Sequence, residues 1–294
     1  MDHRPGALAW ALLLALVCMW GSSFLFNKLG LATVPPATLV AGRLGIGALI
    51  LVGVMRWHGL ALPPPGAMWL RYLALGLVGN AIPFYLITWG QRVVDSALAG
   101  ILMAVMPLAT LVLAHLLVQG ERMTAGRVIG FLIGFAGIVV LMAGKGTSGA
   151  ELVNIVYPLA VLCGALCYAA NSVMTRLMAR GDVLVASTGT LLLASVVAFP
   201  VALYLDRPWT LEPSVSSIAA IVWLGVGPTA VATLCYFRLI GLAGPTFMSL
   251  VNYLSPPVAV LLGVVVMGET PHYSAYAGLA LILSGIAVSQ FRRA

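Results

Sequence analysis

Charged residues are scarce in this chain. Asp, Glu, Lys and Arg together make up 8% of its 294 residues, whereas hydrophobic residues make up 62% and the mean hydropathy is +1.08. A soluble domain of this length cannot bury so much apolar surface, so a lipid bilayer must be its solvent. The net charge of +7 comes from cations that lie singly between apolar runs, which argues against a nucleic-acid-binding surface.

The motifs of pumps and enzymes are also missing. The sequence contains no G-x-x-x-x-G-K-[ST] for ATP, no H-E-x-x-H and no G-x-S-x-G, and its four histidines are scattered. Cys163 and Cys167 share a helix face but have no His or carboxylate neighbour, so we interpret them as packing residues. We therefore predict a protein that is not an enzyme, uses no ATP and holds no metal or other cofactor.

The first apolar run lacks the features of a cleaved signal peptide. No A-x-A site follows it, and Val17 precedes Cys18 where a lipoprotein site would need a small residue. We interpret this run as a retained first membrane span.

Charged, Pro-rich and Gly-rich breaks divide the chain into ten apolar segments. Each is about 20 residues long, the length that crosses roughly 30 Å of hydrocarbon. The segments lie near residues 8–28, 36–56, 67–90, 96–118, 125–143, 152–175, 183–205, 215–238, 245–267 and 273–291. We therefore predict an all-α integral membrane protein with ten transmembrane helices.

The distribution of cations predicts the orientation. With a cytoplasmic N-terminus, ten cations lie on the cytoplasmic side and four on the other, so the positive-inside rule places both termini in the cytoplasm. The cytoplasmic set is Arg4, Arg56, Arg71, Arg122, Arg127, Arg176, Arg180, Arg238, Arg292 and Arg293. The opposite set is Lys28, Arg92, Lys145 and Arg207.

The two halves of the chain resemble each other at a shift of 148 residues. Ser96–Glu121 then aligns with Gly244–Glu269, and the matches include Gly120 with Gly268 and Trp20 with Tyr168. We predict two repeats, residues 1–147 and 148–294, joined by the flexible Gly144–Gly149 stretch. Each repeat holds five spans, an odd number, so the second must be inverted relative to the first.

Prolines and glycines occur inside the third, fourth, eighth and ninth segments, the same two of each repeat. The prolines are Pro83, Pro107, Pro228, Pro256 and Pro257. Kinked helices at a repeat interface indicate a central cavity and its gates, although Pro and Gly are also generally more frequent in membrane helices.

Polar and aromatic side chains recur at helical spacing in the same segments. The predicted substrate-binding residues are Trp20, Ser23, Asn80, Phe84, Tyr85, Thr88, Gln91, Met103, Tyr168, Asn171, Tyr236, Asn252 and Tyr253. Turned inward, they would form a cavity with aromatic walls and neutral hydrogen-bonding groups, suited to a small zwitterionic or amphiphilic solute. The alternative is that they join helix to helix by hydrogen bonds.

Ionisable groups inside the spans are few. Arg43 lies about 10 Å deep in the second segment, at 1.5 Å per residue, so it either snorkels or packs, or it binds a substrate carboxylate or acts in gating. No Asp or Glu lies near the middle of any segment. We therefore predict transport that does not depend on a buried carboxylate.

Glycines at four-residue spacing mark the fifth segment. Gly126, Gly130 and Gly134 form a ridge for close helix approach, either within the bundle or to a second subunit. The sequence leaves open whether the protein is a monomer or a dimer through this ridge.

These residues together resemble the EamA family of the drug/metabolite transporter superfamily. The resemblance rests on Met19–Phe24 (MWGSSF), Arg43 in Ala41–Leu44 (AGRL), Gly120–Arg122 (GER) and the Gly268–Glu269 echo, and it covers nearly the whole chain twice. It implies two inverted five-helix repeats, a location in the bacterial inner membrane and export of metabolites. Within the family, the chain is most similar to exporters of aromatic and other neutral amino acids.

We accordingly interpret the chain as a secondary transporter that exports small neutral metabolites, most of all amino acids, by alternating access. Its expected partners are the substrate and the bilayer. A passive channel for small solutes is the alternative, and an intramembrane enzyme or a scaffold is disfavoured.

Overall fold

All the regular secondary structure in the described part of the chain is helical. The computed structural model describes residues 6–118, 124–143, 155–178 and 181–290, and no strand occurs in these ranges. Seven helices in these ranges are long and apolar enough to cross a membrane, and three shorter apolar helices cover Ala125–Val140, Val251–Met267 and Tyr273–Ser289. The predicted all-α membrane class is confirmed.

The helices follow the predicted segments closely. Those of the first half are α1 (Ala7–Gly30), α2 (Pro36–Trp57), α3 (Ala67–Gly76), η1 (Leu77–Ala81), α4 (Ile82–Gly90), α5 (Ser96–Met103), α6 (Met106–Leu117) and α7 (Ala125–Ala143). Those of the second half are α9 (Val156–Met178), α10 (Val183–Leu205), η2 (Pro208–Thr210), α11 (Val215–Leu224), η3 (Gly225–Val231), α12 (Ala232–Met248), α13 (Val251–Met267) and α14 (Tyr273–Gln290).

Two π-helical segments interrupt the third and eighth predicted spans. They are η1 and η3, and their first residues, Leu77 and Gly225, are 148 positions apart. Pro228 lies inside η3, whereas Pro83 is the second residue of α4, directly after η1. Such short π-helical turns are frequent at functional sites.

The helices of the fourth and ninth predicted spans are broken as well. A gap at 104–105 separates α5 from α6, and another at 249–250 precedes α13. Gly244 has a φ of 78° inside α12, a backbone conformation that favours glycine. Pro107 follows the first gap in the opening turn of α6, and Pro256 and Pro257 lie within α13.

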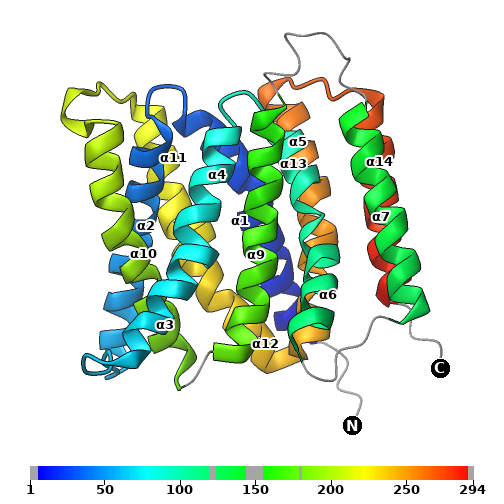
Figure 1. The fold of residues 1–294 in the computed structure, drawn as a ribbon. Helices are drawn as coiled ribbons and strands as arrows, with labels where there is room; N and C mark the ends of the chain where they lie inside the picture. The colour runs from blue at the N-terminus through cyan, green and yellow to red at the C-terminus, as the bar shows by residue number, and fades with distance from the viewer. Residues whose placement is uncertain (1–5, 119–123, 144–154, 179–180, 291–294) are drawn as a thin grey trace.

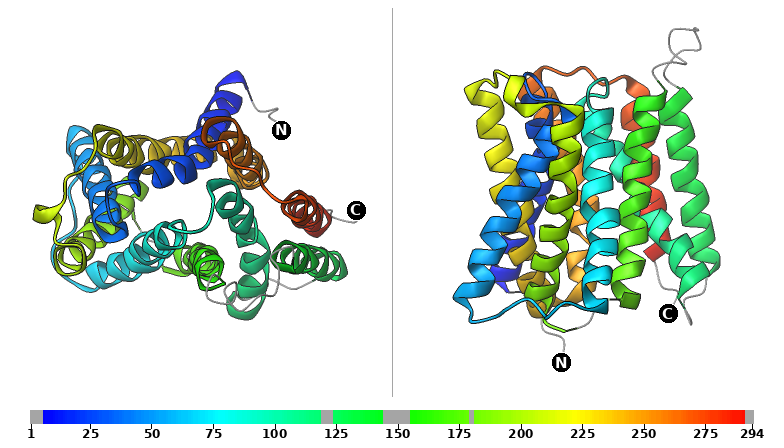
Figure 2. Two further views of the ribbon diagram at one scale, coloured as in Figure 1. Left: turned by 90° about the horizontal axis from the view of Figure 1, so that it is seen from above. Right: turned by 60° about the vertical axis from the view of Figure 1, so that its left-hand side comes forward.

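The helices form an upright bundle in which equivalent elements of the two halves pack together (Figures 1 and 2). Helix α2 packs on α10, and α7 packs on α14. Helix α1 packs on α12 and α13, while α9 packs on α4 and α6. These contacts of the first half with the second thus correspond to one another when the halves are exchanged.

The glycine ridge of α7 is used inside the bundle. A Cβ on Gly130 would clash with the carbonyl oxygen of Gly285 on α14, and one on Gly134 would clash with the Leu108 side chain of α6. Since these two positions lie against neighbouring helices, Gly130 and Gly134 serve packing within this chain.

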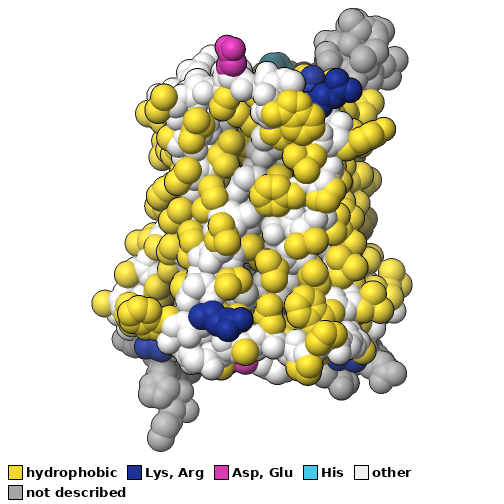
Figure 3. All heavy atoms as spheres, turned by 90° about the vertical axis from the view of Figure 1, so that its left-hand side faces the viewer, with side chains coloured by type: hydrophobic (Ala, Val, Ile, Leu, Met, Phe, Trp, Pro, Cys, Tyr) yellow, Lys and Arg dark blue, Asp and Glu magenta, His cyan; other side chains and the backbone are white. Residues whose placement is uncertain are grey.

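The outside of the bundle suits lipid. Hydrophobic side chains cover the face in Figure 3, and charged side chains lie toward its two ends. In Figure 1, α1 begins and α14 ends at the lower end of the bundle.

Polar contacts join the two halves at helix ends. The Glu269 carboxylate accepts hydrogen bonds from the backbone N–H groups of Ser96 and Ala97, both at 2.8 Å, and from the Ser96 hydroxyl. It therefore caps the N-terminus of α5 from the second half. Its sequence counterpart Glu121, the adjoining Gly120 and Arg122, and the Gly144–Gly149 stretch lie outside the described residues.

Candidate functional site

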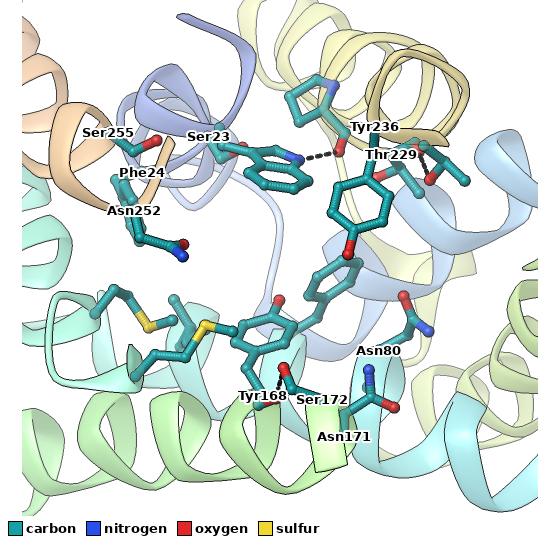
Figure 4. Close-up of a pocket in the computed structure, with 18 of the residues that line it drawn as sticks. Ser23, Phe24, Asn80, Tyr168, Asn171, Ser172, Thr229, Tyr236, Asn252 and Ser255 are labelled. Atoms are coloured by element: carbon teal, nitrogen blue, oxygen red, sulfur yellow. Dashed lines mark hydrogen bonds between the residues drawn. The ribbon is translucent and has the colours of Figure 1, made fainter. Parts of the chain in front are cut away.

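A cavity of about 480 Å³ lies between the two halves, within the range of about 300–1,000 Å³ that is common for ligand pockets. The predicted residues in its wall are Trp20, Ser23, Arg43, Asn80, Phe84, Met103, Tyr168, Asn171, Pro228, Tyr236, Asn252 and Pro256. Helices α1, α4, α5, α6, α9, α12 and α13 contribute to this wall, as do η1 and η3, and α2 contributes Arg43. Figure 4 shows that the labelled side chains come from elements far apart in the sequence.

Aromatic pairs form part of the wall, and each pair joins the two halves. Trp20 lies 6.1 Å from Tyr236 between ring centroids, in a tilted arrangement. Phe84 lies 6.3 Å from Tyr168, edge to face. These distances fall in the range where aromatic rings attract each other, so the pairs stabilise the contact between the halves and present flat apolar surface to the cavity.

The π-helical segment η3 carries a local hydrogen-bond arrangement that follows from its proline. Pro228 has no N–H to donate to the carbonyl of Leu224, four residues earlier. The Thr229 hydroxyl donates to that carbonyl instead, at 2.7 Å. The Pro228 carbonyl accepts a hydrogen bond from Trp20 Nε1 at 3.2 Å. The proline thus leads to a fixed Thr229 hydroxyl in the cavity wall.

Arg43 is held against this hydroxyl. Its Nε donates to Thr229 Oγ1 at 2.9 Å, and its guanidinium carbon lies 3.8 Å from the centre of the Phe84 ring, a cation–π contact. The side chain is 6% exposed, so it turns into the bundle rather than snorkelling to an end. Arg43 is the only Lys, Arg, Asp or Glu among the described residues that line the cavity.

Neutral amide and hydroxyl groups complete the polar part of the wall. Asn80, Asn171 and Asn252 line the cavity, together with Ser255. Among the described residues, Asn171 Oδ1 and Ser255 Oγ are buried and have no hydrogen-bond partner. Because buried polar groups normally find a partner, these atoms are candidates for contact with a solute.

Methionines supply a soft apolar part of the wall. Met103 on α5, Met106 on α6 and Met248 on α12 all line the cavity. Unbranched thioether side chains adapt to ligands of different shape. This part of the wall can therefore accept apolar groups of varied outline.

Several predicted residues lie outside the wall: Tyr85, Thr88, Gln91, Tyr253, Pro83, Pro107 and Pro257. Gln91 is fully buried, where its Oε1 accepts from Asn27 Nδ2 at 3.0 Å and its Nε2 donates to the Phe24 carbonyl at 2.9 Å. Gln91 thus joins the end of α4 to α1. This is the alternative role in which a polar side chain connects two helices by hydrogen bonds.

The other members of this group follow from helix geometry. Thr88 is 1% exposed, because the face that begins with Asn80 and Phe84 continues through Ile87 instead. Tyr253 packs against the hydrophobic cluster around α5, since neighbouring residues such as Asn252 point about 100° apart on a helix. Tyr85 packs against the cluster between α2 and α10.

The wall also contains residues that the prediction did not include, among them Phe24, Met106, Ser172, Met248 and Ser255. A signal for two of them was present. Phe24 and Ser172 each lie one helical turn beyond Trp20 and Tyr168, and they are 148 positions apart. Applying the repeat to whole helix faces would have found this pair.

Comparison with known proteins agrees with this architecture. The EamA-like transporter family matches residues 7–143 and 156–290. A solved structure that is 24% identical superposes with a TM-score of 0.69 and covers 96% of this chain and 97% of its own, which supports the fold alone.

Three relatives with similar sequences carry the names of transporters or exporters. The uncharacterized inner membrane transporter YedA of Escherichia coli K12 is 27% identical over 93% of this chain and 88% of its own. A probable terminal-alkyne amino-acid exporter of Streptantibioticus cattleyicolor is 28% identical, with coverages of 94% and 91%. The aromatic amino acid exporter YddG of Ancylobacter novellus is 30% identical, with coverages of 90% and 93%.

The family match covers both halves of the chain, and the relatives are transporters. With the apolar helices, this identifies a multi-pass protein of the inner membrane. The chain belongs to the EamA-like transporter family.

Proposed function

We propose that this transporter exports small neutral metabolites, above all amino acids with aromatic and other neutral side chains, across the inner membrane. The observation that carries the proposal is the cavity, whose wall combines aromatic rings, amides and one cation from both halves of the chain. A zwitterion with an apolar side chain matches this combination of groups.

We propose alternating access between two inverted five-helix repeats, with ten spans and both termini in the cytoplasm. Three features support it. Helices α1 and α9, which correspond at the shift of 148, run in opposite directions along the bundle in Figure 1. The contacts of α1 and α9, and those of α2 with η3 and α10 with η1, form exchanged pairs, and η1 and η3 begin at equivalent positions. Inverted repeats that meet at a central site are a common design of secondary transporters.

Within the cavity, Trp20, Tyr168 and Tyr236 would contact the side chain of the solute, and Asn80, Asn171 and Asn252 would hydrogen-bond its polar end. The interruptions at η1, at η3 and at the gaps 104–105 and 249–250 would serve as the points where helices bend during opening. Pro228 and Pro256, which line the cavity, lie at or near these points.

The names of relatives agree with the substrate class. One is called an aromatic amino acid exporter and another a probable terminal-alkyne amino-acid exporter. At 30% and 28% identity, these names support amino acids as a class and leave the particular solute to experiment.

Counterflow into proteoliposomes tests the proposal. Vesicles loaded with unlabelled L-phenylalanine should take up labelled L-phenylalanine faster than empty vesicles, and uptake should saturate. A passive channel would give uptake that neither saturates nor accelerates with internal solute. A panel of neutral, acidic and basic amino acids in the same vesicles would define the substrate range.

A further inference from the structure

We propose that Arg43 binds the carboxylate of the transported solute, so that the cavity selects carboxylates over the matching amides. This inference rests on the proposed transport function and names the substrate group that the cavity requires. It starts from the Arg43 guanidinium, which stays charged in proteins and lies in the cavity wall at 6% exposure.

The cavity supplies no charge to match this cation. None of the described residues in its wall is an Asp or Glu. The acidic residues that the structure describes lie at helix ends or in loops: Asp95, Asp182, Asp206, Glu212 and Glu269. A buried cation that lacks a counter-charge is costly in a membrane protein, and such residues mark sites where a substrate supplies the opposite charge.

The guanidinium is oriented, and most of its donors remain available. Its Nε is occupied by Thr229 Oγ1, and one of its flat faces lies over Phe84. The hydrogen bonds between described residues do not include the Nη groups. Arginine presents its N–H groups as a planar fork that matches the two oxygens of a carboxylate, so a guanidinium fixed at Nε is prepared for this contact.

A purely structural role for Arg43 is opposed by the other half of the molecule. The position equivalent to Arg43 on α10 is Leu191, and the position equivalent to Thr229 in η1 is Ala81. Both are buried in the hydrophobic cluster between α2 and α10. The same helix packing is therefore made there with apolar side chains, and it does not require an arginine.

Other groups in the cavity wall suit the ammonium group and the side chain of an amino acid. Asn171 packs against Gly79, which lies on η1 five residues before Phe84, and its Oδ1 is buried with no partner among the described residues. An ammonium group could donate to this oxygen. Met103, Met106 and Met248 line the same cavity and would accept an apolar side chain.

Equilibrium binding to the purified full-length protein tests the inference apart from transport. L-phenylalanine and L-phenylalaninamide are titrated into the wild type and Arg43→Gln by calorimetry, and the ratio of their Kd values is compared. We expect the wild type to bind the acid about 10- to 100-fold tighter than the amide, since a hydrogen bond to a charged group contributes about 1.5–3 kcal/mol. Arg43→Gln should bring the ratio close to one, and Arg43→Lys should restore part of it.

Leu191→Met provides a matched control, because it changes the equivalent buried position without touching a charge. It should keep the wild-type ratio. A fluorescence melt of each variant shows whether it is folded before its ratio is read.

The inference is overturned if the wild type binds neither compound or does not prefer the acid. It is also overturned if folded Arg43→Gln keeps the preference, or weakens both compounds equally. Selective binding that Arg43→Gln abolishes, combined with no counterflow, would uphold this inference and refute the proposed transport. Counterflow by a protein that binds the acid no more tightly than the amide would uphold the proposed transport and refute this inference.

Discussion

The contact of α2 with η3 and the contact of α10 with η1 are equivalent in the two halves but differ in chemistry. The first contains Arg43 and Thr229, joined by a hydrogen bond of 2.9 Å. At the equivalent positions of the second, Leu191 and Ala81 are 4% and 9% exposed and belong to one hydrophobic cluster. The comparison teaches that equivalent helices of both halves form the scaffold and the cavity, whereas a single polar contact gives the cavity its charge.

Elsewhere the two halves supply the wall at equivalent positions with different side chains. Trp20 and Tyr168 both line the cavity, and so do Ser23 and Asn171. Aromatic character is kept at the first pair and polarity at the second. The shift of 148 residues therefore predicts where side chains meet the cavity, whereas the residue at each position determines the chemistry of the wall.

The largest expected effect comes from placing an arginine at position 191, the equivalent of Arg43 in the second half. Leu191→Arg buries a guanidinium in the apolar cluster of α2 and α10. Uncompensated buried charge costs about 3–5 kcal/mol, so the variant should melt well below the wild type in a thermal unfolding assay in detergent. Leu191→Met, which keeps the volume and adds no charge, should melt close to the wild type. Equal melting of Leu191→Arg and the wild type would show that the two contacts are not different environments.

A second prediction concerns how the halves are joined. Glu269→Ala removes the cap that the second half places on α5, leaving three donors of Ser96 and Ala97 without their acceptor. We expect a loss of about 1–3 kcal/mol of stability, measured by thermal unfolding.

Asp182→Ala is the matched control for this cap. The Asp182 carboxylate caps α10 within its own half, through Leu184 N–H and Val185 N–H. It should cost about 1 kcal/mol, the usual effect of losing one cap. If the two variants lose the same stability, the cross-half position of Glu269 adds nothing to an ordinary helix cap.

A smaller effect is expected at the equivalent aromatic pair. Trp20→Phe keeps a ring but removes the hydrogen bond to the Pro228 carbonyl, which should lower stability by about 1 kcal/mol. Tyr168→Phe should cost less, because no hydrogen bond between described residues uses the Tyr168 hydroxyl. The melting temperatures of the two variants check this order, and a larger loss for Tyr168→Phe would contradict it.

The smallest expected effect is that of a proton gradient. Neither half places a carboxylate in the described cavity wall. Proton-coupled carriers usually need such a group within the membrane, so counterflow should not be driven by an imposed pH difference. Substrate accumulation that follows the pH gradient and disappears on replacing one acidic residue would contradict this prediction.

Much of the fold could be predicted from the sequence, because long apolar runs bounded by Pro, Gly and charge determine helix positions. Trp20 and Tyr168 occupy equivalent positions in the two halves, and this match correctly predicted one aromatic ring in the cavity wall from each half. The interruptions were harder to predict. Pro83 and Pro228 indicated kinks, but whether a kink becomes a π-helical turn depends on tertiary packing around η1 and η3.

The site was predicted less completely, for reasons of helix geometry. The sequence did not show the gap at 249–250, so it could not separate the face of Asn252, which meets the cavity, from that of Tyr253, which packs against α5. Nor could helical spacing distinguish a polar residue in the wall from one such as Gln91 that joins two helices. Those choices are made by contacts between helices distant in sequence.

Accessibility of the cavity from the two sides of the membrane tests the central claim most directly. Ser172 lines the cavity, so Ser172→Cys in a background without the four native cysteines can be labelled with a membrane-impermeant thiol reagent in vesicles of known orientation. Alternating access predicts labelling from either side, with rates that substrate shifts in opposite directions. Labelling from one side only, with or without substrate, would contradict the account.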